Sequence, residues 1–130
     1  MVSIPQSHLD LITSSQTVIL ATHGPDGFPQ VTALWFLAGE DGTIQLSINT
    51  ARQKAKNLQQ QPEATLFFVD PANPYRTLEI RAIADVQPDP DYVLANKVGA
   101  KYGSDLGKMD QPGETRVAVS FEVVKVNTFD

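Results

Sequence analysis

The sequence predicts a mainly β protein, a small closed antiparallel barrel of six strands that forms one domain over residues 1–130. Two observations lead to this fold class. Short apolar runs rich in β-branched residues follow one another across glycine-containing turns, as at residues 24–27 and 39–42. Helical patterns follow only the third and fifth of these runs, whereas a parallel α/β sheet needs a helix after nearly every strand.

The chain begins with a short helix expected within residues 2–14, in which Pro5 follows Ser3 as an early helix residue. We expect this helix to pack over one end of the barrel. The first strand covers residues 17–22, and the turn after it leads to a second strand over residues 29–37.

Both faces of the second strand are apolar, although a lone barrel buries only one face of each strand. One face carries Val31, Ala33, Trp35 and Leu37, and the other carries Thr32, Leu34 and Phe36. The second apolar face therefore needs a cover, which is either a helix or a second copy of the protein.

The third strand runs straight into a helix that carries two cations at its start. Thr50 or Asn49 is the expected N-cap of this helix, which covers residues 51–58. Arg52 and Lys54 lie in the first turn, where the helix dipole disfavours a cation by roughly 0.3–1 kcal/mol. Two cations and free N–H groups at one point predict a site for a phosphate or another anion. A solvated surface helix that begins with basic residues explains the pattern equally well.

The remaining strands are recognised by alternation of apolar and polar residues. Counted with the third strand, they cover residues 44–49, 63–70, 76–86 and 116–126. Residues 76–86 show the cleanest alternation in the chain, so we expect this strand to be long and central. The alternation of the last strand breaks at Val123 and Val124, which indicates a β-bulge.

A helix and a loop separate the fifth and sixth strands. Asp89 is the expected N-cap and Pro90 the first residue of the helix, which stops at Gly103. Residues 104–113 contain two glycines, a proline and several polar residues, and this composition predicts a mobile loop.

Composition narrows the possible functions. A hydrophobic content of 42% fits one domain with a modest core, and a net charge of −5 argues against a nucleic-acid or anionic-membrane partner. The absence of cysteine excludes disulfides, thiolate nucleophiles, iron–sulfur clusters and Cys-ligated zinc. Redox chemistry would therefore need a bound cofactor. With no apolar run of membrane-spanning length, we expect a cytoplasmic protein with no membrane partner.

Few side chains suggest protein-based catalysis. His8 and His23 have no second ligand at metal spacing, so we interpret both as surface residues and expect no metal site. No serine lies in a nucleophile-elbow context, and we expect no catalytic residue. Asp89 and Asp91 resemble an acid–base pair, but helix capping explains them fully.

Four side chains in or beside the expected strands are candidates for ligand contact or for a structural role. Glu79 is expected to form a structural ion pair, whereas for Arg81 ligand contact is nearly as good an explanation as ion pairing. Core packing is expected for Trp35 because it lies within a strand. Tyr75, at a strand entrance, is the better candidate for stacking on a planar ligand.

Three motifs spread over nearly the whole chain give it a family resemblance. They lie at residues 21–31, at residues 52–58 with Gln61 and Pro62, and at residues 70–81. With these motifs the chain resembles the pyridoxamine-phosphate-oxidase-like, FMN-binding split β-barrels, and within them the small proteins that use the deazaflavin coenzyme F-420.

The resemblance implies a six-stranded split barrel that forms a homodimer with two cofactor sites at the subunit interface. The phosphate positions match Arg52 and Lys54, with Thr50 beside them. The strands that flank the cofactor ring match Val31, Thr32, Ala33, Ser47, Ile48 and Asn49. The residues that approach from the partner subunit match Tyr75, Arg76 and Arg81. Lysines that could meet the polyanionic tail of F-420 are Lys56, Lys97, Lys101 and Lys108.

The leading hypothesis is a dimeric oxidoreductase that binds coenzyme F-420, with FMN as the alternative cofactor, and passes a hydride to or from a small organic substrate. The chain lacks the C-terminal extension of the larger oxidases, so oxidation of pyridoxamine phosphate is not expected. The alternatives are a non-enzymatic flavin, haem or tetrapyrrole carrier on the same fold, and an interaction module without a cofactor.

Overall fold

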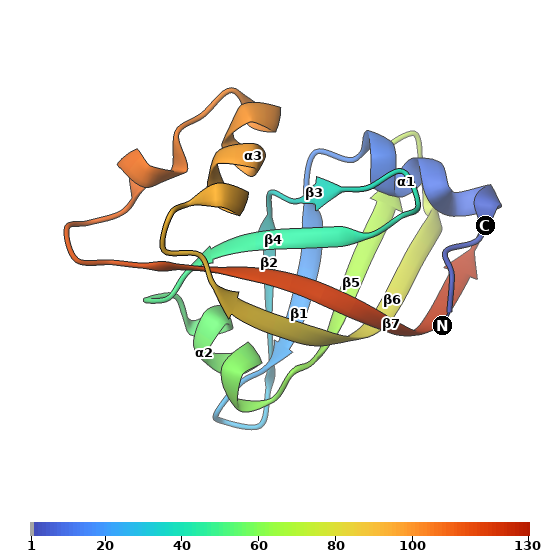
Figure 1. Ribbon diagram of the computed structural model, residues 1–130. Coiled ribbons are helices and arrows are strands. Elements are labelled where there is room, and N and C mark those ends of the chain that lie inside the picture. Colours follow the sequence, from blue (N-terminus) through green and yellow to red (C-terminus); the bar gives the residue numbers. More distant parts are fainter. Residues whose placement is uncertain (1) are drawn as a thin grey trace.

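The computed structural model describes residues 2–130, and its seven strands form one antiparallel sheet that curls into an open barrel (Figure 1). The strands are β1 (Val18–His23), β2 (Pro29–Leu34), β3 (Leu37–Ala38), β4 (Ile44–Asn49), β5 (Glu63–Asp70), β6 (Asn73–Pro88) and β7 (Arg116–Phe129). Their order in the sheet is β2-β1-β5-β6-β7-β4-β3. The helices are α1 (Leu9–Ser14), α2 (Gln53–Gln60) and α3 (Val93–Tyr102), with 3-10 turns η1 (Gln6–His8) and η2 (Leu106–Met109).

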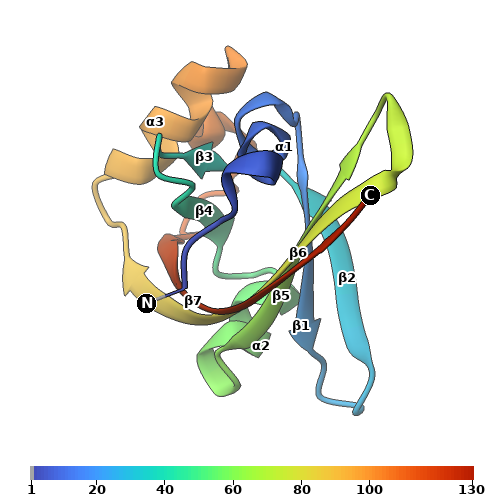
Figure 2. The same cartoon turned by 90° about the vertical axis from the view of Figure 1, so that its right-hand side faces the viewer.

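The main core fills the inside of the curled sheet. Alternate residues of the strands point inward, so that Leu20, Leu66 and Ile80 are fully buried. Two helices close the ends of the barrel (Figure 2). The helix α1 adds buried Leu11 and Ile12 to the core at one end, and α2 adds Ala55 and Leu58 at the other.

A second, smaller core lies between α3 and the outer face of one half of the sheet. The apolar residues of α3 and η2 pack there against Trp35, Leu37 and Ala118. The ring of Trp35 stacks on Tyr102 with a centroid separation of 4.5 Å and an interplanar angle of 4°. This stacking fastens α3 to the chain between β2 and β3.

The expected second strand, residues 29–37, is divided in the structure, which makes seven strands instead of six. The chain leaves the sheet at Trp35 and Phe36, because Trp35 turns to α3 while Phe36 enters the main core, where its ring meets Phe68 edge-on at 5.4 Å. The prediction that Trp35 lies within a strand was therefore wrong. A helix covers Trp35 and Leu37, but Val31 remains 59% exposed on the outer face.

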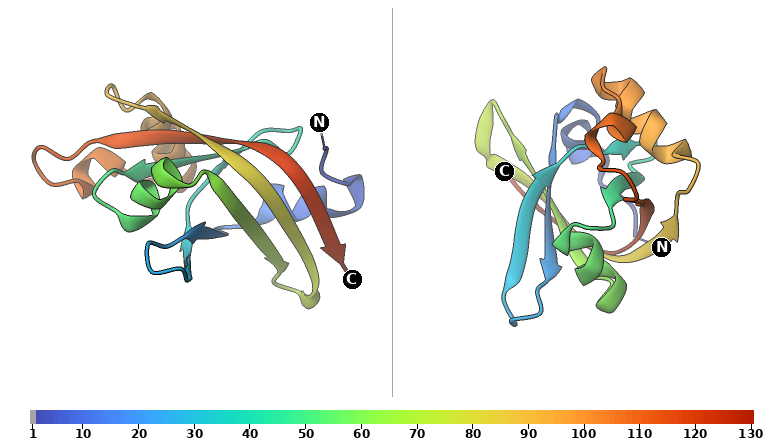
Figure 3. Two further views of the ribbon diagram at one scale, coloured as in Figure 1. Left: turned by 90° about the horizontal axis from the view of Figure 1, so that it is seen from below. Right: turned by 90° about the vertical axis from the view of Figure 1, so that its left-hand side faces the viewer.

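The long central strand and the bulge are confirmed. The strand β6 has 16 residues and stands fourth of seven in the sheet. Figure 3 shows β6 and β7 running side by side and bending together. Their register shifts where Arg81 pairs with Lys125 but Ala82 pairs with Val123, so that Val124 is the extra residue of the bulge.

Three local predictions about the C-terminal half and the N-terminus need correction. The helix α3 begins at Val93 and not at Pro90. The Asp89 carboxylate nevertheless accepts hydrogen bonds from three of the first amides of the helix. Gly103 ends the helix in the left-handed conformation, as expected. The segment predicted as a mobile loop, residues 104–113, instead contains the 3-10 turn η2, and Leu106 in this turn is buried. His8 is a buried residue with 2% exposure, whereas His23 is exposed as predicted.

None of the helices in residues 2–130 combines the length and the hydropathy that a membrane span requires.

Candidate functional site

The two cations that the sequence pointed to lie where β4 passes into α2. The Asn49 backbone carbonyl accepts a hydrogen bond from the Arg52 amide at 3.0 Å, and the Asn49 side-chain oxygen accepts one from the Ala51 amide at 2.8 Å. These bonds form a tight turn before the helix, so α2 begins at Gln53 and Arg52 itself occupies the N-cap position. The prediction of Thr50 or Asn49 as N-cap was wrong, since the Thr50 hydroxyl is bonded to Thr115 instead.

Arg52 and Lys54 are unpaired cations. Among the side chains of residues 2–130, no carboxylate lies within 4.0 Å of either one. Burial, and secondly repulsion from Arg52, lower the pKa of the Lys54 ammonium below its usual value. Arg52 extends into solvent, whereas Lys54 is half-buried. Positive charge is therefore concentrated here without compensation, and an anion would relieve it.

A buried polar cluster fixes α2 against the hairpin of β1 and β2. The Asn57 amide nitrogen donates to the Thr22 hydroxyl at 3.0 Å and to the Gln30 side-chain oxygen at 3.2 Å. The Gln53 side-chain nitrogen in turn donates to the Asn57 oxygen at 2.8 Å. Because Asn57 and Thr22 are each 3% exposed, these bonds hold the start of α2 beside the polar inner face of β2.

Two strand edges near the cations have no strand partner within the described chain. The strand β2 pairs only with β1, and the Leu46–Asn49 part of β4 pairs only with β7. The barrel is thus open along β2, whose candidate residues are Val31, Thr32 and Ala33, and along the end of β4. The Ser47 and Asn49 carbonyls already accept hydrogen bonds from Arg116 and Arg52, but the other outward-facing backbone groups on these edges can hydrogen-bond a ligand.

The β4 candidates have structural roles as well. Ile48 is 2% exposed and belongs to the main core. Ser47 accepts hydrogen bonds from the Arg116 guanidinium at 3.3 Å, through both its backbone and its side-chain oxygen. Only the backbone of Ile48 can therefore reach a ligand.

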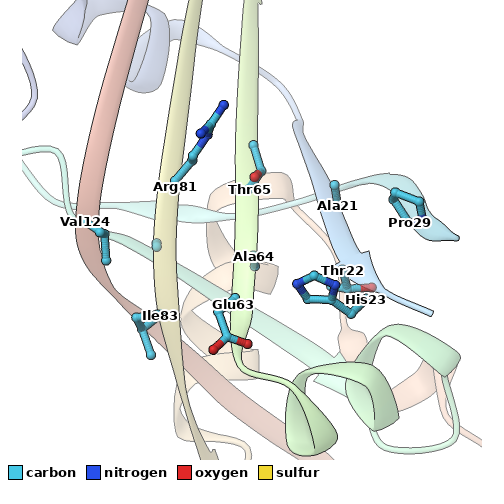
Figure 4. A pocket seen from close by; sticks show the side chains of 11 residues that line it. Ala21, Thr22, His23, Pro29, Glu63, Ala64, Thr65, Arg81, Ile83 and Val124 are labelled. Atoms are coloured by element: carbon cyan, nitrogen blue, oxygen red, sulfur yellow. The ribbon is translucent and has the colours of Figure 1, made fainter. Parts of the chain in front are cut away.

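The outer face of the other half of the sheet has no cover within residues 2–130. A groove of about 410 Å³ crosses it (Figure 4), in which Ala21, Thr65 and Arg81 stand opposite one another on three neighbouring strands. Val31 continues this row on β2, opposite Ala21. The Arg81 guanidinium lies 3.3 Å from the Glu79 carboxylate, which confirms the expected ion pair for Glu79. The side chain of Arg81 remains 54% exposed.

A single chain does not bring Tyr75 and Arg76 to the cations. They lie beside the turn between β5 and β6, at the end of the molecule opposite α2 (Figure 2). Tyr75 is 73% exposed, whereas Arg76 bridges Asp10 at 2.6 Å and Asp70 at 3.1 Å. Hydrogen bonding to Asp10 raises the pKa of the Arg76 guanidinium further above its usual value. Arg76 thus ties the N-terminal helix to the hairpin of β5 and β6.

A pair of charged residues close to the cations was not predicted from the sequence. Asp110 and Arg116 form a buried ion pair with a nitrogen–oxygen distance of 2.8 Å, and both side chains are less than 10% exposed. Asp110 lies in the segment that was expected to be mobile. A charged residue at the start of an apolar strand, as Arg116 is, could have indicated a buried partner.

Several known proteins are similar to this chain in sequence or in fold. A model of the family described as pyridoxamine 5'-phosphate oxidase matches residues 4–130. No curated protein sequence matches the chain. A solved structure described as an F-420 reductase has a TM-score of 0.80 and 31% identity, over 95% of this chain and 98% of its own. A conserved hypothetical protein from Mycobacterium tuberculosis has a TM-score of 0.77 and 27% identity, over 100% and 86%. The heme storage protein HutZ from Vibrio cholerae shares the fold at 18% identity, with a TM-score of 0.67 over 98% and 96%.

Proposed function

Since the chain belongs to the pyridoxamine 5'-phosphate oxidase family, we propose that it is an oxidoreductase that binds coenzyme F-420, or FMN in its place, between two copies of the barrel. It would pass a hydride to or from a small organic molecule. The observation that carries the proposal is the pair of unpaired cations at the start of α2, Arg52 and Lys54. The similarity to an F-420 reductase at 31% identity supports the choice of F-420 as the first cofactor to test.

The residues present fit a phosphorylated, planar cofactor. A phosphate beside Arg52 and Lys54 would accept charge-assisted hydrogen bonds. Its charge would offset the burial and the repulsion from Arg52, which together lower the pKa of Lys54. The amides of Gln53 and Lys54, at the N-terminus of α2, add two donors. Thr50 and Asn49 lie next to this point, and the open edges of β2 and β4 offer backbone groups for a ring.

A second copy of the chain would complete the site. The uncovered outer face around Val31 and Ala33 is the surface that we assign to the dimer contact, because apolar residues on it are exposed in one chain. From the partner, Tyr75, Arg76 and Arg81 would approach the cofactor. Arg81 and Tyr75 are the more available of these, since Arg76 is already bonded to two carboxylates.

In this proposal the protein binds and orients, and no side chain acts as catalytic base. When bound, the flavin or deazaflavin ring supplies the hydride chemistry. Arg52 and Lys54 neutralise the phosphate and fix the position of the ring relative to β2. The second barrel excludes water from the ring.

The test is equilibrium binding of FMN and of F-420 to the wild type and to the double variant Arg52→Ala, Lys54→Ala. Two charge-assisted hydrogen bonds are worth about 1.5–3 kcal/mol each, so we expect affinity to fall by roughly a hundredfold or more. The control is Lys56→Ala with FMN, which lacks the polyanionic tail of F-420. This variant removes an exposed cation further along α2 and should bind FMN as the wild type does. Failure of both cofactors to bind, or equal binding by the double variant, would refute the phosphate site.

A second candidate is a non-enzymatic carrier of flavin, haem or tetrapyrrole. HutZ is described as a heme storage protein, which is a function of this kind. That similarity, at 18% identity, concerns the fold alone. Turnover separates the two candidates. A reduced cofactor that binds tightly but is not reoxidised by any member of a panel of quinones, enones and tetrapyrroles would favour the carrier.

A further inference from the structure

The buried ion pair of Asp110 and Arg116 is the centre of a polar network at the end of β4. The Asp110 carboxylate accepts two hydrogen bonds from the Arg116 guanidinium, at 2.8 and 2.9 Å, and one from the Tyr92 hydroxyl at 2.6 Å. A fourth comes from the Asn49 side-chain nitrogen at 2.9 Å. Hydrogen bonding to Arg116 lowers the pKa of Asp110 to about 2, so this carboxylate is charged at neutral pH.

Asn49 joins the network to the turn that carries Arg52. Its side-chain nitrogen donates to Asp110 and to the Glu114 carboxylate, each at 2.9 Å. With the nitrogen held by two carboxylates, the amide has one orientation, and its oxygen faces the Ala51 amide. The backbone of the same residue accepts the Arg52 amide, so the direction of the chain into α2 depends on how Asn49 is held.

The network also holds the nearby carboxylates in hydrogen bonds that do not involve the two cations. Glu114 is close enough for the charge of Arg52 to lower its pKa, although the Gln111 amide and Asn49 contribute more to that shift. These two donors, at 2.7 and 2.9 Å, hold the carboxylate, and it forms no ion pair with Arg52 within 4.0 Å. Asp110 is occupied by Arg116 in the same way. Arg52 and Lys54 therefore remain available to an external anion.

We propose that Asp110 is a positioning residue for the anion site, acting through Asn49 on the turn from Asn49 to Arg52. In this role it would act without contacting the cofactor or the substrate. This inference rests on the proposed function in so far as the anion is a cofactor phosphate.

The test compares Asp110→Asn with Asp89→Asn. Asp89 is also buried and also holds backbone amides, those at the start of α3, but none of the hydrogen bonds described for Asp89 reaches Asn49. Each variant and the wild type are titrated with FMN and F-420, and with their phosphate-free counterparts riboflavin and 5-deazariboflavin. Exchange of the Ala51 and Arg52 amide hydrogens is measured without any cofactor.

We expect Asp110→Asn to weaken binding of the phosphorylated cofactors roughly tenfold, the equivalent of one lost hydrogen bond, and to leave the phosphate-free compounds unchanged. A residue with a merely structural role would weaken both kinds equally. The Ala51 and Arg52 amides should exchange about ten times faster in Asp110→Asn than in the wild type or in Asp89→Asn.

Equal loss of both kinds of compound, or exchange that matches Asp89→Asn, would overturn the inference. If the wild type does not distinguish phosphorylated from phosphate-free compounds, the proposed function fails. The amide exchange then decides on its own whether Asp110 holds the turn.

Discussion

Removing the charge of Asp110 should abolish one part of the acid sensitivity of the fold. The ordinary pKa of an aspartate is 3.8, and in the folded protein the Arg116 guanidinium and other donors hold the pKa of Asp110 at about 2. A carboxylate whose pKa is lower in the folded state stabilises the fold at every pH above its unfolded value. That stabilisation is lost as the pH falls from about 4 through about 2. The difference in pKa corresponds to about 2 kcal/mol.

The variant Asp110→Asn keeps the shape of the side chain and removes its charge. At pH 7 it should lose about 3–5 kcal/mol of unfolding free energy, because Arg116 stays buried without its partner. Urea denaturation of wild type and variant at several pH values between 2 and 7 measures this difference. Asp10, whose pKa is also lowered but without any contribution from Asp110, titrates in both proteins, so its effect cancels in the difference between the two curves.

The difference in stability should be constant above pH 5 and shrink by about 2 kcal/mol toward pH 2. Tyr92→Phe, which removes one of the hydrogen bonds that lower the pKa of Asp110 but leaves the ion pair with Arg116, should keep most of the wild-type pH dependence. Parallel curves for wild type and Asp110→Asn over the whole range would show that the ion pair does not hold the carboxylate in its charged form.

Three further variants test other parts of the structure. Val31→Asp places a charge on the uncovered outer face, and it should convert a dimer to monomers in sedimentation while leaving the circular dichroism spectrum unchanged; a dimer that persists would exclude this face as the contact. Phe36→Ala removes a fully buried ring from the main core, and its unfolding free energy should fall by about 3–5 kcal/mol; a loss under 1 kcal/mol would contradict the described packing. Gly103→Ala puts a side chain at a φ of 66°, and thermal unfolding should show a loss of about 1 kcal/mol, whereas no loss would mean that α3 ends elsewhere.

Local patterns in the sequence predicted the structure correctly where residues close together in the sequence determine it. Strict alternation predicted β6 as the long central strand, and its interruption at Val123 and Val124 predicted the bulge. Gly103 was predicted to end α3, and it does so. Asp89 was predicted as the N-cap residue; Tyr92 holds that position, although the Asp89 carboxylate does accept hydrogen bonds from the first amides of the helix. Each of these features depends on backbone chemistry within a few residues.

Contacts between distant segments account for the errors. The second strand divides because Trp35 stacks on Tyr102, which lies far along the chain in α3. Residues 104–113 are ordered by Arg116 and by Asn49, and neither partner can be recognised from the composition of that segment. His8 is buried, although the sequence around it contains no strongly apolar run that would indicate burial.

The candidate site was predictable only in part. The pattern around residues 49–54 indicated the two cations, and the structure places both beside the open edges of β2 and β4. The start of α2 was misplaced, because side-chain bonds from Asn49 and Thr50 form a turn before the helix. The residues that hold this turn in place come from a segment far along the chain.

The half of the outer face that α3 does not cover would link cofactor affinity to protein concentration. If the ring lies between two copies of the chain, a separated subunit offers the phosphate site around Arg52 and Lys54 but only part of the remaining contacts. Cofactor would then favour association, and association would favour cofactor, by the same free energy. Dilution of the protein should release cofactor even at a fixed cofactor concentration, and added cofactor should reassemble the subunits.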